Sequence, residues 1–290
     1  MSLLSKADSA DAEKAEITVS ASAKGASVVA LNLEFRFPAL LNNLALVYRH
    51  RNQLSESEVL YRRALAEMGD GAVNFHAETL NNLGVLLADQ GRWKETEDLA
   101  RKAIAEWEVL LGPDHPTVAA GLINLAVAVK SQHRYAEASR LLERARGINA
   151  RNLPPDHPRV ATELNAEAAV AAARKRYPEA EVLLLRALDI RERTLAPEHP
   201  EIGLVLGNLA EVYRSQKKPA QAEQSFSRAL DILERAWGPE DQRLLKWVEA
   251  YAALLRTHQD YAEAARRDMQ AMKIRVVHTL RSGGAGLATF

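Results

Sequence analysis

The sequence lacks several features that mark common protein classes. In 290 residues it has no cysteine, 6% aromatic residues, 14 Gly, 11 Pro and no net charge, with 38 Lys and Arg against 38 Asp and Glu. A disulfide scaffold or a zinc site built on thiolates needs cysteine, and collagen-like or disordered chains need far more Gly and Pro. A nucleic-acid-binding protein normally carries a basic excess that releases counterions, so the neutral balance argues against that class.

Long apolar runs are also missing. No stretch of 18 or more apolar residues occurs, and the first residues lack the basic region and apolar core of a signal peptide. We therefore expect no membrane segment and a cytoplasmic location, which the absence of cysteine also fits. The residues that are abundant instead, Ala, Leu, Glu and Arg, lose little conformational freedom in a helix. The composition favours a helical protein.

A motif of an acidic residue, His and Pro recurs at a spacing of 42 residues. It stands at 114–116, 156–158 and 198–200, and the next step lands on 240–242, where Glu-Asp-Gln replaces it. Asn-Leu followed by Gly or Ala keeps the same spacing, and a step of 39 backwards finds it again at 43–45. A fixed period of this size indicates a repeat architecture, so we predict six units between about residues 36 and 281.

Each unit is predicted to be a pair of antiparallel helices. The apolar residues recur at spacings of 3 and 4, and Pro directly after His suits a first helical position, whose amide needs no partner. Two amphipathic helices cannot bury their apolar faces alone, so neighbouring pairs must stack. The predicted fold is an all-α right-handed solenoid of six helix pairs over 36–281. Residues 1–35 are predicted to be a mobile N-terminal arm with a potential cap, and 282–290 a flexible tail.

The two ends of the predicted solenoid differ from the repeats between them. The apolar residues between 28 and 37 are expected to cover the open end of the stack as an irregular or strand-like segment. Pro38 lies only five residues before Asn43, so the first helix is expected to be shortened. At the other end, the Arg and Lys residues of the last helix are expected to solubilise its outer face.

Four columns of the repeat are selective for side-chain size. Three hold only small residues and one holds bulky residues: Ala45, Gly84, Ala126, Ala168, Ala210 and Ala252; Ser57, Thr96, Ala138, Ala180, Ala222 and Ala264; Ala64, Ala103, Ala145, Ala187, Ala229 and Ala271; and Leu41, Leu80, Leu122, Leu164, Leu206 and Val248. This combination resembles the tetratricopeptide repeat. The 42-residue period and Gly-Pro-Asp-His-Pro at 112–116 are similar to the repeats of the kinesin light chain family and its bacterial relatives. The resemblance covers about 245 residues and implies non-catalytic binding of a protein or peptide in a concave groove.

The resemblance also implies which residues would face that groove. An asparagine column comprises Asn43, Asn82, Asn124 and Asn208, and six residues further along the same helices stand Arg49, Lys130, Arg214 and Arg256. A carboxamide can both donate to and accept from a peptide backbone, and the cations would favour an acidic segment or a terminal carboxylate. Two alternatives stay open: the asparagines bond within the repeats, and the cations belong to a solvated face with ordinary salt bridges.

Motifs of catalysis and cofactor binding are absent. There is no Gly-x-x-x-x-Gly-Lys-Ser/Thr, Gly-x-Gly-x-x-Gly, Gly-x-Ser-x-Gly or His-Glu-x-x-His, so we expect no enzyme activity and no cofactor. His115, His157 and His199 belong to different units, about 10 Å apart at helix-packing distance, so we predict that they mark helix starts and bind no metal. The Ala-rich stretch 166–173 of the fourth unit is either a shallow pocket or a degenerate repeat in which Glu167 meets an Arg, and we favour the second.

The predicted function is that of an interaction scaffold for an extended partner segment. The expected partner is a protein or peptide, with no nucleic acid and no membrane, and the chain is expected to be a monomer or a weak homo-oligomer. The alternative is self-assembly or an adaptor role through the ends of the solenoid, which exposed apolar residues there would indicate.

Overall fold

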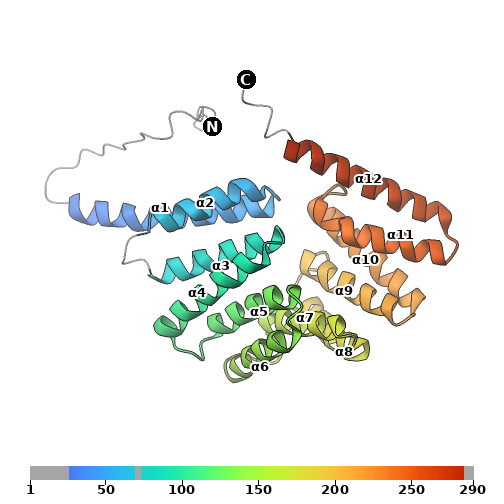
Figure 1. The fold of residues 1–290 in the computed structure, drawn as a ribbon, viewed down its shortest axis with the longest axis horizontal. Coiled ribbons are helices and arrows are strands. Elements are labelled where there is room, and N and C mark those ends of the chain that lie inside the picture. The colour runs from blue at the N-terminus through green and yellow to red at the C-terminus, as the bar shows by residue number, and fades with distance from the viewer. Residues whose placement is uncertain (1–25, 69–72, 284–290) are drawn as a thin grey trace. The chain divides into compact units, whose positions relative to one another are not determined.

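The computed structural model describes residues 26–68 and 73–283, and in these ranges it contains helices and no strand (Figure 1). The helices are α1 (Ala26–His50), α2 (Leu54–Ala66), α3 (Val73–Asp89), α4 (Trp93–Leu111), α5 (Pro116–Ser131), α6 (Tyr135–Asn152), α7 (Pro158–Ala173), α8 (Tyr177–Thr194), α9 (Pro200–Ser215), α10 (Pro219–Trp237), α11 (Leu245–Thr257) and α12 (Tyr261–Gly283), with a short 3-10 turn at Gln242–Leu244. The predicted all-α series of helix pairs is confirmed.

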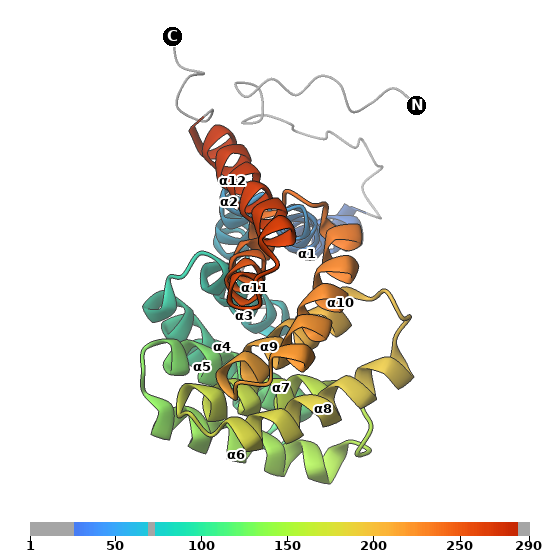
Figure 2. The same ribbon diagram turned by 90° about the vertical axis from the view of Figure 1, so that its right-hand side faces the viewer.

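The chain forms two compact units, 1–75 and 76–290. In the first unit α1 packs against α2. In the second unit the pairs α5–α6, α7–α8, α9–α10 and α11–α12 pack internally, and a hydrogen bond from Thr96 Oγ1 on α4 to the Gly84 carbonyl joins α3 to α4. The first helices of successive pairs also contact one another, α5 with α7, α7 with α9 and α9 with α11 (Figure 2). They therefore form a continuous layer of the second unit.

The small columns lie where helices approach most closely. All members of the three columns are buried, and Ala145, Ala187 and Ala229 are fully inaccessible to solvent. The bulky column beside them is buried as well. Small side chains allow the two helices of a pair to come close, and the bulky ones fill the space between them. The predicted core of the repeats is confirmed.

The turns between the two helices of each pair share one backbone feature. One residue per turn adopts a positive φ of 58° to 75°, and these residues stand one repeat apart: Asn52, Gly91, His133, Lys175, Lys217 and Gln259. The amide of the residue that follows donates back to a carbonyl near the end of the first helix, as when the Arg176 N–H donates to the Ala171 carbonyl at 2.8 Å. This left-handed cap satisfies carbonyls that the helix leaves unpaired, and only one of the six positions uses glycine for it.

The start of the described chain differs from the prediction. Residues 28–37 are not irregular or strand-like, because α1 runs without interruption from Ala26 through Pro38 to His50, so the first helix is not shortened. The predicted boundary at residue 35 falls inside this helix. The apolar residues between 28 and 37 were expected to form an irregular or strand-like segment, but a helix satisfies its backbone hydrogen bonds within its own segment, whereas a strand needs a partner. Residues 1–25 of the predicted arm and 284–290 of the tail lie outside the described residues.

Candidate peptide-binding face

The predicted asparagine column lies on the first helices, and two of its members bind the preceding repeat. Asn124 Nδ2 on α5 donates to Asn81 Oδ1 on α3 at 2.9 Å. Asn208 Nδ2 on α9 donates in the same way to Asn165 Oδ1 on α7 at 3.0 Å. One amide hydrogen of each is therefore used between repeats, and among the described residues the other has no partner. The sequence analysis did not predict these acceptors, because each lies 43 residues before its donor and the repeat spacing is 42.

A hollow opens beside Asn208, between the fourth and fifth repeats. It has a volume of about 230 Å³ and is lined by Ala168, Ala169, Ala172, Tyr177, Leu184, Asn208, Glu211, Val212 and Ser215. The alanines of the fourth repeat leave space here that larger residues would fill. Glu167 points elsewhere and pairs with Arg146 Nη1 at 3.2 Å. Both readings of the fourth repeat therefore hold, since it has a shallow apolar floor and its glutamate meets an arginine.

Two lysines from distant repeats face the same region of the second unit. Burial lowers the pKa of Lys130 on α5. Burial also lowers the pKa of Lys246 on α11, and the positive charge of Lys130 lowers it further, against the opposing charge of Glu211 on α9. The charge of Lys130 on α5 reaches Lys246 on α11 although the two lysines stand 116 residues apart in the sequence. Because Glu211 also lines the hollow beside Asn208, these side chains form one region, which we call the lysine face.

Neither lysine of this face forms an ion pair with a carboxylate in the part of the chain that the structure describes. The Lys246 ammonium lies over the ring of Trp247, 3.9 Å from its centroid, while Glu211 is engaged by Arg214 at 2.7 Å. The face therefore carries excess positive charge in partly desolvated surroundings, where an anion is bound more strongly than in open water. Sequence reasoning identified Lys130 but missed Lys246, which belongs to a different column of the repeat.

Two of the other predicted cations, Arg214 and Arg256, already form ion pairs within the chain. Arg214 pairs with Glu211 on its own helix, and Arg256 on α11 pairs with Asp268 on α12 at 2.6 Å. These exposed pairs match the alternative of a solvated face with ordinary salt bridges. Asn43 and Arg49 lie on α1 in the first unit, and Asn82 is half-buried on α3. Of the eight predicted residues, the described contacts bring Lys130 and Asn208 into the lysine face.

The motif histidines cap helices. His115, His157 and His199 each precede the proline that opens α5, α7 or α9, and each Nδ1 accepts the amide hydrogen two residues on, at 3.2, 3.1 and 3.2 Å. One repeat later Asp241 takes the same place, and its carboxylate accepts from the Arg243 amide at 2.9 Å. The prediction that these histidines mark helix starts is confirmed, and the altered motif at 240–242 keeps the cap with a different side chain.

The acidic residue of the motif ties the start of a helix pair to the second helix of that pair. Asp114 pairs with Arg151 at 2.6 Å and Asp156 with Arg193 at 3.0 Å, each arginine 37 residues further along the chain. The third motif repeats this geometry with an ion pair between Glu198 and Arg235. The Asp/Glu-His-Pro motif therefore fastens each helix pair, because the acidic residue reaches the end of the second helix while the histidine caps the start of the first.

Two carboxylates between repeats have opposite pKa shifts. Burial raises the pKa of Glu97 on α4, but hydrogen bonds from Arg101, Gln132 and Arg134 outweigh it and hold the pKa at about 2. Burial raises the pKa of Glu163 on α7, and one hydrogen bond from Asn149 only partly opposes it. The surroundings of Glu97 stabilise its charged form, whereas burial makes the charged form of Glu163 unfavourable.

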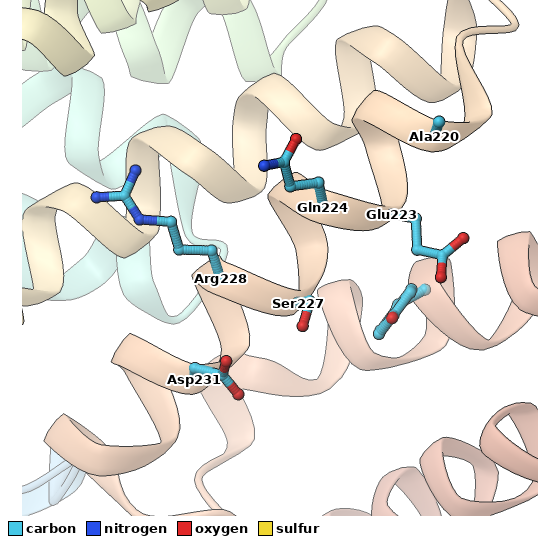
Figure 3. Close-up of a pocket in the computed structure, with 7 residues that line it drawn as sticks. Ala220, Glu223, Gln224, Ser227, Arg228 and Asp231 are labelled. Atoms are coloured by element: carbon cyan, nitrogen blue, oxygen red, sulfur yellow. The ribbon is translucent and has the colours of Figure 1, made fainter.

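A larger depression lies on α10 and carries no converging set of groups. It has a volume of about 550 Å³ and is lined by Ala220, Glu223, Gln224, Ser227, Arg228, Asp231 and Tyr251. Arg228 and Glu223 reach to opposite sides of the helix (Figure 3), and Arg228 pairs with Glu192 of α8 at 2.6 Å. This arrangement is an open polar surface, and its side chains are used for contacts between repeats.

Across 26–68 and 73–283, no three His, Asp or Glu side chains are grouped so that they would hold a metal ion. None of the helices in these ranges is long and apolar enough to cross a bilayer.

Comparison with known proteins identifies the repeats. Two models of the tetratricopeptide repeat match the sequence, one at residues 75–151, 158–235 and 205–275 and the other at 39–67. Together they cover most of the chain. No curated protein matches the sequence significantly.

Solved structures share the fold at low sequence identity. BtubC (BKLC) from P. vanneervenii is 23% identical with a TM-score of 0.59, over 80% of this chain and 91% of that one. A structure from Podosopora anserina, of nearly identical TPR-like repeats of a putative kinesin light chain, is 22% identical with a TM-score of 0.53. The match covers 71% of this chain and 95% of that one. A Rap protein complexed with competence and sporulation factor is 15% identical with a TM-score of 0.62, over 84% and 75%. At these identities the likeness establishes the fold.

Proposed function

Since the chain belongs to the tetratricopeptide repeat family, whose fold generally serves protein–protein interaction, we propose that it is a non-catalytic scaffold that binds an extended acidic segment of a partner protein. The binding site is the lysine face of the second unit. The single observation that carries this proposal is that Lys130 of α5 and Lys246 of α11 lie within range of each other's charge, and neither forms an ion pair with a carboxylate among the described residues.

The geometry suits a peptide that carries a carboxylate and a small apolar side chain. A carboxylate placed between the two ammonium groups would relieve their mutual repulsion and would compensate for their partial desolvation. The hollow of about 230 Å³ next to Asn208 offers space for a small apolar side chain of the same segment, and the remaining amide hydrogen of Asn208 offers a donor to its backbone. A stiff stack of helices orders little on binding, so the entropic cost falls mainly on the ligand.

The comparisons also support a repeat subtype and ligand binding by this fold. The 42-residue period and the likeness to structures of kinesin light chain repeats support the kinesin light chain-like subtype. The complex of a Rap protein with its factor supports ligand binding by a protein of this fold. The cytoplasmic location and the absence of catalysis stay predictions from the sequence.

Fluorescence anisotropy with charge-matched peptides tests the proposal. The probe is a pool of fluorescein-labelled decapeptides rich in Glu and Asp, compared with the same pool in which Gln and Asn replace them. We expect binding of the acidic pool only, and a loss of about tenfold or more in affinity when Lys130→Gln and Lys246→Gln are combined. Binding should also weaken with salt.

A matched control uses lysines outside the lysine face. Lys94→Gln and Lys102→Gln together remove the same charge from exposed positions of α4 and should leave the affinity nearly unchanged. Equal losses in both double variants, or equal binding of the two peptide pools, would refute the assignment of the site. Substitution of the asparagines is a less direct test, because Asn124 and Asn208 also join repeats.

A further inference from the structure

Two helices at opposite ends of the repeat series expose apolar stripes. The stripe on α1, which we call the head stripe, consists of Phe37, Leu40, Leu44 and Val47. The stripe on α12, which we call the tail stripe, consists of Met269, Met272, Val276 and Leu280. In both, the residues are spaced by 3 or 4 and so share one face of their helix. Leu40 is 65% exposed and Met272 is 66% exposed, which is unusual for side chains of this size in a regular repeat.

The head stripe occupies a position that is covered elsewhere in the chain. The repeat register places Leu40 in the same column as Gly121, Glu163, Val205 and Trp247, all of which are buried. At Gly121 the cover comes from Ile104 and Trp107 of α4, and at Glu163 it includes Asn149 of α6. In each case the second helix of the preceding repeat covers the position.

The tail stripe occupies the complementary position. The register places Met272 in the same column as Ile104, Leu188 and Leu230, which are buried. In α6 the same column holds Arg146, which pairs with Glu167 on α7. The known contacts of this column, Ile104 with Gly121 and Arg146 with Glu167, reach the positions that Leu40 and Leu44 occupy on α1. Among the described residues, one chain therefore exposes both halves of its own repeat-to-repeat interface.

We propose that the tail stripe of one copy docks on the head stripe of a second copy, so that the stack of repeats continues from α12 of the first into α1 of the second. Met272 of one copy would pack beside Leu40 and Leu44 of the other. Continuity with the interface between repeats within the chain selects a second copy as the occupant, because both surfaces already match in register. Flexible Met side chains adapt to such a surface. The contact is heterologous, since the two stripes differ.

Sedimentation velocity on the full chain over a range of concentrations tests this contact. We expect the wild-type chain to associate as its concentration rises, and Leu40→Glu or Met272→Glu each to be monomeric alone. An equimolar mixture of the two variants should form a one-to-one dimer that does not grow, because one variant keeps its tail stripe and the other its head stripe. Circular dichroism establishes that each variant is folded.

The control substitutions lie in a column that is exposed in several repeats. Val59→Glu on α2 and Val182→Glu on α8 remove exposed apolar residues outside both stripes, and both should associate like the wild type. A wild-type chain that stays monomeric at all concentrations would overturn the proposal. So would association of either stripe variant alone, which indicates like-with-like docking, or a mixture that stays monomeric. Association that begins only after residues 1–25 are removed would assign the head stripe to that segment instead.

Discussion

The junction of α4 with α5 and the junction of α6 with α7 occupy the same place in successive repeats, yet they are closed by different chemistry. At the first, Trp107 packs on Gly121, where an added Cβ would lie 3.0 Å from the ring and 2.8 Å from Ile104. At the second, Asn149 Nδ2 donates to Glu163 Oε2 at 2.6 Å, and both side chains are buried.

The difference shows how the repeat tolerates such variation. A large side chain on a glycine and a hydrogen-bonded polar pair both fill the gap between a second helix and the next first helix. The apolar junction gains stability from buried area, whatever the pH. The polar junction gains less and depends on the charge of a buried carboxyl group, because an ionised carboxylate with one hydrogen bond is not fully compensated.

The largest expected effect is at the apolar junction. Trp107→Ala should lower the free energy of unfolding by about 3 to 5 kcal/mol, because it removes a large buried side chain beside a glycine that cannot fill the cavity. Asn149→Ala, at the same place in the next repeat, should cost about 1 to 3 kcal/mol by leaving Glu163 without its donor. Urea unfolding measures both. Val109→Ala, on the exposed face of α4, is the control and should be nearly neutral. A smaller loss for Trp107 than for Asn149 would contradict the comparison.

A smaller effect is expected for Glu97, which joins the second and third repeats. Its folded pKa of about 2 lies below its ordinary value of 4.5, so its stabilisation is present above pH 4.5 and is lost as the pH falls toward 2. Glu97→Gln should therefore cost about 2 to 3 kcal/mol at pH 7, and the difference from wild type should shrink in acid. Urea unfolding at several pH values measures it. A difference that is constant with pH would exclude the charged network as its source.

The smallest effect, with the opposite sign, is expected for Glu163. Burial raises its folded pKa above the unfolded value, so ionisation at neutral pH destabilises the fold, and this penalty disappears once both states are protonated in acid. Glu163→Gln should therefore stabilise the chain at pH 7 by about 1 kcal/mol and converge with wild type as the pH falls. The exposed Glu143→Gln serves as the control. Destabilisation by Glu163→Gln at pH 7 would show that the polar junction needs the charge.

Several features of the fold could be read from the sequence because they depend on neighbours in the chain. The small columns, the bulky column and the histidine caps act within one helix pair or one turn, so a period of 42 residues was enough to place them. The prediction of an irregular or strand-like segment at 28–37 was wrong, because these residues lie in the helix α1. Apolar alternation alone does not distinguish a strand from a helix when no partner strand is identified.

The candidate site was only partly predictable. Lys130 followed from its column, but its association with Lys246 did not, because that lysine sits in another column three repeats away. The hydrogen bond of Asn124 to Asn81 was not predicted for a similar reason, since the two residues are 43 apart and the repeat spacing is 42. Both depend on how far each first helix is turned and shifted relative to the next.

The sequence by itself determined the family, the helix pairs and the small contacts that hold each pair, because periodicity and local hydrogen bonding act over a few turns of chain. Only the tertiary structure decided which side chains of different repeats meet. It placed Lys246 within range of the charge of Lys130, opened the hollow beside Asn208, and left the head and tail stripes exposed among the described residues. The physical reason is that the rotation from one repeat to the next is set by the packing of all the buried side chains together, and a small change at each step accumulates along the stack.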